Sequence, residues 1–597
     1  MIVKTAKMKK YTIYSQSLLF AIFLLCSCNK GFLNRYPMDE ISSETFWNSE
    51  NDLRIYNNGI YDITLGSDVP IMLGHEGIDF TGMVWTADEF TDNLAPTANI
   101  FYQQVRSGKF TVPSDPQPFG YTGWQLVRAC NIGLENYNRA KIDQSIIDKY
   151  AAEARLFRGW FYADKVEMFG DVPWFDTELN IDSKELYEDR TPRDSVMSKV
   201  LEDLNFACEK LPDDWDDGNA PGRLNRWAAL LLKSRICLFE GTWQKYRGGS
   251  NVNMWLQEAA DAAKELIENG PYSLFSTGDP QHDYNTTQRA ADLTGNPEVI
   301  YWKKYKLGIQ TNSVMDWYCA RAGYGGATKS LVEDYLCTDG LPITTSPLYM
   351  GDQVYENIFQ NRDPRLRQTI LDPADQAYYN YERNLTYSYP RVTGMDGGTI
   401  TTTGYHVIKM YNSTTAGATF GTAETPAIVM RLGEALLNYA EAKAELGSIT
   451  QADVDLSINK LRDRVGMPHL DMSNVPVDPR YENDGVSPLI VEIRRERRVE
   501  LCFEGKFRYD DLRRWKQGKK LEIPTLGMRW DNANSSRFDP ANAATVKTTM
   551  VSGVKYIDVY QGTDFANPTF DENKDYLWPI PLSVMAQNAN ISQNPGW

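Results

Sequence analysis

Two segments of the chain combine flat aromatic side chains with short polar ones, which suits the recognition of a sugar ring. In the first segment, residues 77–97, Trp85 stands near Asp92 and Asn93. An indole ring can cover the apolar C–H face of a sugar, while carboxylate and amide groups pair with its hydroxyls. We therefore predict that Trp85 stacks on a glycan, with Asp92 and Asn93 as polar partners. The alternative is that the aromatic side chain only packs the loop onto a scaffold.

The second segment, residues 313–327, has a similar make-up. Trp317, Tyr318 and Tyr324 lie close in sequence to Arg321, and glycines end the stretch. We predict that these residues make further glycan contacts, with the same packing alternative for each aromatic. The sequence does not indicate which monosaccharide or linkage would bind.

Residues that would carry catalysis or hold a metal are sparse. The chain has four histidines and eight cysteines, with no H-E-x-x-H, G-x-S-x-G, phosphate-binding loop or C-x-x-C pair. We therefore predict no cofactor, no histidine- or cysteine-based metal site and no disulfide framework, while an incidental Ca²⁺ bound by loop aspartates stays open. A glycoside hydrolase stays an alternative, because 79 acidic residues offer many carboxylate pairs whose separation the sequence does not give.

The N-terminus has the pattern of an export signal. Lysines 4, 7, 9 and 10 precede an apolar run at 18–25, which is shorter than the roughly 20 apolar residues that span a bilayer. Leu25-Cys26-Ser27-Cys28 resembles a bacterial lipobox, so we predict a lipoprotein signal peptide over 1–27 and lipidation of Cys28. Cleavage as an ordinary signal peptide is the alternative. The net charge of −17 argues against a nucleic-acid partner.

Helical periodicity predicts a mainly α-helical fold. The pattern indicates a helix that starts near residue 147 and stops at Gly170, and others over 193–210, 225–240 and 255–269. In the C-terminal half it indicates helices over 427–447, 452–468 and 487–515. Small residues suit closely paired antiparallel helices. Long irregular stretches at 66–118, 270–360 and 372–425 interrupt the helices, and Trp302 lies in an alternating pattern typical of a core strand.

Two motifs have a structural interpretation. Glutamates at 496, 500 and 504 alternate with arginines at 494, 495, 497 and 498, a spacing that predicts ion pairs along one helix face. A polyanion site is the less favoured alternative, because the acidic residues neutralise the basic ones. The prolines of 578–581 predict an extended path that pins the tail to the scaffold.

Nine motifs, taken in order, resemble the SusD/RagB family of outer-membrane lipoproteins of Bacteroidetes. They are CNKGFLNRYP (28–37), FWNSENDL (46–53), EARLFRGWFYADKVEMFGDVPWF (153–175), GRLNRWAALLLKSRICLFEG (222–241), NRDPRL (361–366), MRLGEALLNYAEAKAELG (430–447), LRDRVGMP (461–468), RRERRVELCFEGKFRYDDLRRW (494–515) and YLWPIPLSVMAQNANISQNPGW (576–597). The resemblance runs from end to end.

The resemblance implies a SusD-like α-superhelix with tetratricopeptide-like helix pairs, long irregular loops and minor β-strands. Residues 28–597 would form a single domain, with an N-terminal scaffold part to about 275 and a C-terminal part from about 276. It further implies a non-enzymatic lipoprotein, lipid-anchored at the outer membrane and facing the cell exterior. Such a protein captures oligosaccharide or polysaccharide and delivers it to a SusC-like TonB-dependent transporter. A RagB-like lid that binds peptides is the alternative, and a lid that recognises no ligand by itself is another.

Overall fold

The computed structural model describes most of the chain after residue 45. The described residues are 46–64, 73–75, 86–96, 100–116, 120–216, 222–312, 314, 325–374, 378–380, 385–387, 389–392, 401–411, 421–538 and 543–597. Within these ranges, no helix combines the length and the apolar character that a bilayer crossing requires. The same ranges hold no group of histidine, cysteine or carboxylate side chains arranged around a possible metal ion. Cys130, Cys208, Cys237, Cys337 and Cys502 are free thiols.

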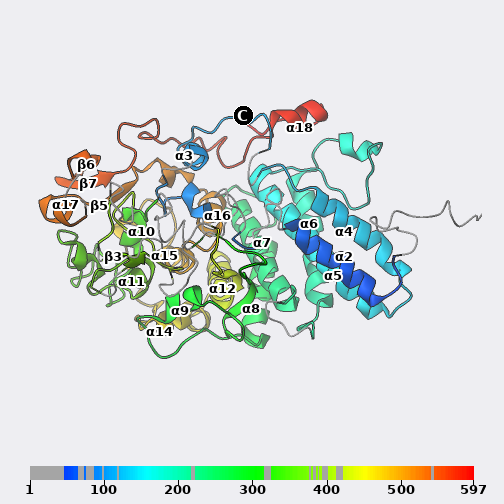
Figure 1. Ribbon diagram of the computed structural model, residues 1–597, viewed down its shortest axis with the longest axis horizontal. Helices are drawn as coiled ribbons and strands as arrows, with labels where there is room; N and C mark the ends of the chain where they lie inside the picture. Colours follow the sequence, from blue (N-terminus) through cyan, green and yellow to red (C-terminus); the bar gives the residue numbers. More distant parts are fainter. Residues whose placement is uncertain are drawn as a thin grey trace, which may run out of the picture.

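The N-terminal half is a stack of helices that follow one another in chain order. The stack comprises α2 (Glu50–Thr64), α4 (Gln125–Asn136), α5 (Gln144–Phe169), α6 (Arg193–Lys210), α7 (Arg226–Lys245) and α8 (Val252–Asn269). Each helix packs against the next, and Figure 1 shows the stack running from one end of the molecule to its middle. The superhelix predicted from the sequence is thereby confirmed.

The predicted helix boundaries follow from local signals. α6 has the predicted bounds, Arg193–Lys210, and it begins directly after Pro192. α5 ends at Phe169, because Gly170 adopts a positive φ of 72° that other residues rarely tolerate. The Asn225 side chain accepts a hydrogen bond from Ala228 N and so caps α7.

The C-terminal half continues the stack and adds small sheets. α12 (Leu432–Glu445) packs on α7 and α8, and α15 (Pro488–Leu501) packs on α12. Further helices of this half are α13 (Gln451–Leu456), α14 (Ile458–Arg464) and α16 (Phe507–Arg514). The other short helices are α3 (Ile100–Arg106), α9 (Asp283–Arg289), α10 (Lys329–Asp334), α11 (Arg365–Thr369), α17 (Asn532–Phe538) and α18 (Leu582–Gln587). The 3-10 turns are η1 (Thr86–Phe90), η2 (Tyr137–Arg139), η3 (Lys184–Tyr187), η6 (Tyr355–Phe359), η7 (Pro479–Tyr481), η8 (Gly518–Glu522) and η9 (Ala543–Thr545).

The strands are few, short and antiparallel. β1 (Val299–Lys303) pairs with β4 (Ala427–Arg431), and β2 (Tyr378–Asn380) pairs with β3 (Leu385–Tyr387). β7 (Val554–Asp558) lies between β5 (Leu526–Arg529) and β6 (Thr548–Val551). Trp302 on β1 is buried, as its alternating pattern predicts.

Three predicted helices differ from the structure. Residues 427–431 form β4 instead of the first turns of a helix, because this short apolar run finds a partner strand in β1. The helix predicted over 452–468 is broken at Ser457, which separates α13 from α14. The helix predicted over 487–515 is broken between α15 and α16, where Phe503 and Gly505 both have positive φ.

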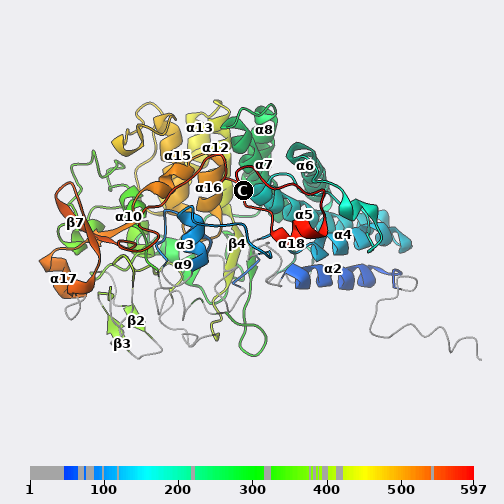
Figure 2. The same cartoon turned by 90° about the horizontal axis from the view of Figure 1, so that it is seen from above.

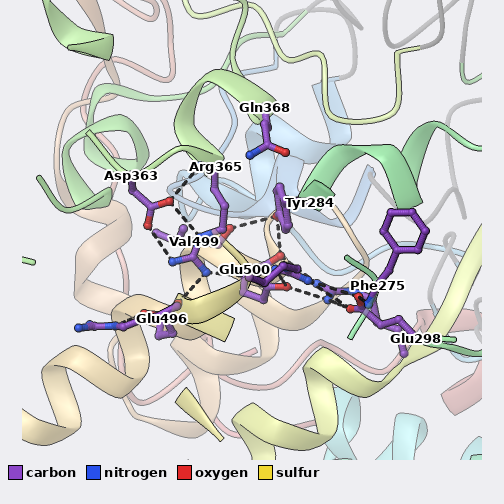
Figure 3. A network of polar contacts seen from close by, with 12 residues as sticks. Phe275, Tyr284, Glu298, Asp363, Arg365, Gln368, Glu496, Val499 and Glu500 are labelled. Atoms are coloured by element: carbon purple, nitrogen blue, oxygen red, sulfur yellow. Dashed lines mark hydrogen bonds and ion pairs between the residues drawn. The ribbon is translucent and has the colours of Figure 1, made fainter. Parts of the chain in front are cut away.

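The arginines and glutamates of α15 are buried, and most of their partners come from other elements. Glu500 lies at the centre of this arrangement. It accepts hydrogen bonds from Arg365 Nη1 at 2.9 Å, Arg431 Nη1 at 2.7 Å and Arg464 Nη2 at 2.7 Å. These arginines come from α11, from the end of β4 and from α14, and Figure 3 shows Arg365 reaching Glu500 between Asp363 and Glu496.

The predicted pairing along one helix face is therefore wrong for most of these charges. Glu496 pairs with Arg462, and Glu504 pairs with Arg431 and Lys409. Burial alone would raise the pKa of Glu500, but Arg464, Arg431 and Arg365 together hold it well below its usual range. These buried ion pairs join α11, β4, α14 and α15, and each buried charge is stable only when its partners are present.

The C-terminal tail returns to the N-terminal helices, as the proline pattern at 578–581 predicts. Trp578 N donates to Met168 O at 2.7 Å, and Trp578 Nε1 donates to the hydroxyl of Tyr509 at 2.6 Å. Asn594 Nδ2 donates to Phe169 O at 2.9 Å, just where α5 ends. In Figure 2 the tail crosses the face of the molecule, forms α18 beside the N-terminal helices and then ends at the point marked C.

Replacing the central carboxylate should destabilise the whole fold. Glu500→Gln keeps the side-chain volume but leaves three buried guanidiniums without their shared anion, so we expect the free energy of unfolding to fall by about 3–5 kcal/mol. Urea unfolding of the chain without its predicted signal peptide measures this. The control is Glu178→Gln, which breaks the solvent-exposed pair with Arg128 and should cost about 1 kcal/mol or less. Equal losses in the two variants would contradict a central role for Glu500.

The same pair of variants predicts a pH dependence. The folded pKa of Glu500 lies below its unfolded value near 4.3, so its contribution is fully present above that value and is lost as the pH falls below it. We therefore expect the stability difference between the wild type and Glu500→Gln to shrink between about pH 5 and pH 3. Urea titrations at fixed pH steps measure it, and a difference that grows on acidification would show that the sign is wrong.

Candidate functional site

The two segments that the sequence marks for sugar contact end side by side. Leu94 and Ala327 form an antiparallel bridge. Ala95 N donates to Gly326 O at 2.9 Å, and Thr328 N donates to Asn93 O at 2.9 Å. Backbone pairing thus joins the C-terminal ends of segments that are more than 200 residues apart in the sequence.

A third segment completes this junction. Ala327 N donates to Tyr405 O at 3.0 Å, and the Thr402 hydroxyl donates to Ala95 O at 2.7 Å. Residues 93–95, 325–328 and 401–405 together form what we call the loop base. Gly326 is its tightest point, because a Cβ there would lie 2.3 Å from Oγ1 of Thr403 and 2.4 Å from Oγ1 of Thr401.

The N-terminal side of the second segment is also fixed. Asn312 and Ala423 exchange two backbone hydrogen bonds of 2.9 Å, and the Thr311 hydroxyl donates to Gly421 O at 2.6 Å. Both ends of the segment that contains Trp317 therefore start from paired backbone.

Most of the predicted contact residues lie outside the described part of the chain. These are Trp85, Trp317, Tyr318, Arg321 and Tyr324, and the predicted lipidation site Cys28 lies outside it as well. Their roles stay predictions. The described residues show that the segments carrying these aromatics are anchored at one common base.

Asp92 lies under the loop base in a charge pair. Its Oδ1 and Oδ2 each accept a 2.7 Å hydrogen bond from Arg508, and Arg498 Nη2 lies 3.2 Å from Oδ2. Burial would raise the pKa of Asp92, but the two guanidiniums hold it below its usual range. The carboxylate is ionised and bound by arginine, and its role as a sugar partner stays a prediction.

Asn93 is fully buried, and its amide is used within the protein. Its Nδ2 donates to Asp88 Oδ1 at 3.1 Å, and its Oδ1 accepts a 2.8 Å hydrogen bond from Arg498 Nε. The second oxygen of Asp88 accepts from the backbone N–H of Phe503 at the break between α15 and α16. The structure thus gives Asn93 a scaffold role, while a sugar contact from it is untested.

Arg498 and Arg508 are the functional residues that the sequence analysis missed. They reach Asp92 across some 400 residues of chain, and Arg498 Nη1 also donates to Asp334 on α10 at 2.6 Å. The spacing of Arg498 with nearby glutamates predicts local pairing, and no sequence signal points to Asp92 as the partner of either arginine. Through these two arginines the ionic layer around α15 extends to the loop base.

The comparisons with known proteins agree with one another. Residues 279–597 match the family model described as the SusD family, and residues 83–238 match one described as starch-binding associating with outer membrane. The chain is 24% identical to SusD-like protein P2 of Formosa agariphila over 99% of its length and 100% of that protein. It is 22% identical to a SusD-like protein of Bacteroides ovatus over 99% of this chain and 98% of the other.

Solved structures share the fold. A SusD-like carbohydrate-binding protein of Bacteroides fragilis superposes with a TM-score of 0.70 at 22% identity, covering 92% of this chain and 100% of that one. A laminarin-binding SusD-like protein superposes with a TM-score of 0.59 at 19% identity over 92% and 100% of the two chains.

Crowding at Gly326 gives a direct test of the loop base. Gly326→Ala would push a methyl group into Thr401 and Thr403, so we expect the free energy of unfolding to fall by about 1–3 kcal/mol. Gly325→Ala is the matched control, because the nearest atoms to its added Cβ lie at 3.5 Å or more. Chemical unfolding curves of both variants measure the difference, and equal stability would contradict the tight packing described here.

Proposed function

Because the chain belongs to the SusD family, we propose that it is a glycan-binding lipoprotein of the outer membrane. It captures oligosaccharide or polysaccharide at the cell exterior and delivers it to a SusC-like TonB-dependent transporter. It carries out no catalysis. Cys28 is the lipidated residue that anchors the chain.

The observation that carries this proposal is the shared loop base. Trp85 belongs to one of the joined segments, and Trp317 and Tyr318 belong to the other. Aromatic faces that cover the apolar face of a sugar act best on a support that does not reorganise on binding. Backbone pairing at Leu94 and Ala327, with Arg498 and Arg508 beneath, supplies such a support.

The names of similar proteins support the same function. One structural neighbour is described as carbohydrate binding and another as laminarin binding. The family model that matches residues 83–238 is described as associating with the outer membrane. These descriptions favour sugar as the cargo and the outer membrane as the location.

Binding to polysaccharides tests the proposal. Titration calorimetry of residues 29–597 against plant, host, microbial and fructan polysaccharides should find at least one ligand. A buried aromatic platform is worth about 1.5–3 kcal/mol, so Trp85→Ala and Trp317→Ala should each weaken binding about tenfold or more. Tyr187→Ala is the control, since Tyr187 is an exposed aromatic residue in a different loop.

Two outcomes would count against the proposal. No binding to any polysaccharide, together with binding to peptides, would favour a peptide cargo. Glycan binding that neither tryptophan variant weakens would place the site elsewhere on the protein.

A further inference from the structure

A small cavity opens beside the loop base, between α3, α10 and the chain that leads into β5. Its volume is about 130 Å³. At about 30 Å³ per water molecule, this is room for about four waters or for one small oxyanion with its hydrogen-bond donors. The lining residues that matter are Asp92, Arg106, Lys329, Lys520 and Thr525. Figure 1 shows α10 and β5 close together, away from the N-terminal stack.

Arg106, the last residue of α3, is a buried cation without a carboxylate partner. It is only 5% exposed, and none of the carboxylates in the described ranges forms an ion pair with it. Its Nη2 donates to Thr91 O at 3.2 Å, and its guanidinium lies 5.2 Å from the ring centre of Tyr560. Its Nε has no hydrogen-bond partner in the described structure. A buried guanidinium is normally balanced by an anion, and no described carboxylate balances the guanidinium of Arg106.

The other charges around the cavity leave it positive. Glu333 is paired with Lys329, and Asp92 is held by Arg498 and Arg508. Lys520 contacts Asp484 at 3.0 Å, yet burial and the nearby Arg508 lower its pKa. Among the described residues that line the cavity, Arg106 is therefore the charge left without a counter-charge.

A hydroxyl donor completes the site. The Thr525 side chain is buried at the cavity wall and makes no side-chain hydrogen bond to any described residue. A hydroxyl and a guanidinium that line the same cavity suit an anion with several oxygens, which accepts more than one hydrogen bond.

We propose that this cavity is an oxyanion site that takes the carboxylate or sulfate group of an acidic glycan. The inference rests on the proposed function and deepens it, because it assigns the cargo to acidic polysaccharides. The cavity adjoins the loop base, since Asp92 lines it and Thr328 belongs both to it and to the loop base. A glycan bound at the loop base would place its charged substituent in the cavity with Arg106.

Small anions provide the first test. At equal ionic strength, sodium sulfate and sodium D-glucuronate should each raise the melting temperature of the wild type more than that of Arg106→Gln, whereas D-glucose should not distinguish the two proteins. The general stabilisation by an excluded salt acts on both proteins alike. A hydrogen bond to a charged group is worth about tenfold or more in affinity, so Arg106→Gln should weaken calorimetric binding of either anion by at least that factor. The probe that binds more tightly identifies sulfate or carboxylate as the preferred group.

Two further variants keep the test decisive. Thr525→Val keeps the side-chain shape and all ion pairs, and it should weaken anion binding severalfold even if Arg106→Gln folds poorly. Arg537→Gln is the control. Arg537 lies on α17 and pairs with Glu356, so its replacement should leave anion binding unchanged. Anion binding that is equal in the wild type, Arg106→Gln and Thr525→Val would overturn the site.

Matched polymers separate this inference from the proposed function. Dextran sulfate compared with dextran, and polygalacturonate compared with its methyl ester, differ only in the charged group. Tighter binding of a charged polymer that is lost in Arg106→Gln supports the inference. Binding of neutral polysaccharides that depends on Trp85 but ignores Arg106 overturns the inference alone. If sulfate or glucuronate binds but no polysaccharide does, the proposed function is overturned. The cavity is then an anion site that takes no glycan.

Discussion

The fold depends on one buried carboxylate, Glu500, and the three guanidiniums that share it. A buried charge is costly unless its partners are all present, so the ion pairs around Glu500 form together or not at all. Their arginines come from α11, β4 and α14. The C-terminal half therefore assembles around electrostatic complementarity as much as around its apolar core. The apolar contacts of α12 with α7 and α8 then join this half to the N-terminal stack.

The same helix, α15, connects the ion pairs around Glu500 to the loop base. Glu500 binds arginines from other elements, whereas Arg498, on another part of the helix surface, reaches Asp92, Asn93 and Asp334. The segments that carry the predicted aromatics are thus held at their ends by charges that the core also holds. A ligand that contacts the loop base would meet backbone that is already paired, which lowers the cost of ordering on binding.

The sequence predicts some elements of the fold and misses others. α6 was predicted with its observed bounds, and the end of α5 was predicted from Gly170, because both depend on local signals. The residues of β4 are predicted as helix, since a run of four apolar residues suits either state until its partner strand is known. The composition of the two aromatic segments pointed to a site, but their meeting at Leu94 and Ala327 is a long-range pairing that no local pattern encodes. For the same reason Arg494, Arg497 and Arg498 of α15 are predicted to pair on their own helix, whereas their partners lie on other elements.

The return of the tail to α5 has a consequence for the order of events in folding. Trp578, Ile580 and Ile591 belong to the same apolar core as residues of α2, α4 and α5. The first helices to be synthesised therefore keep part of their core open until the last twenty residues have left the ribosome. Contacts between residues so far apart in the sequence form slowly, so this part of the core closes late in folding.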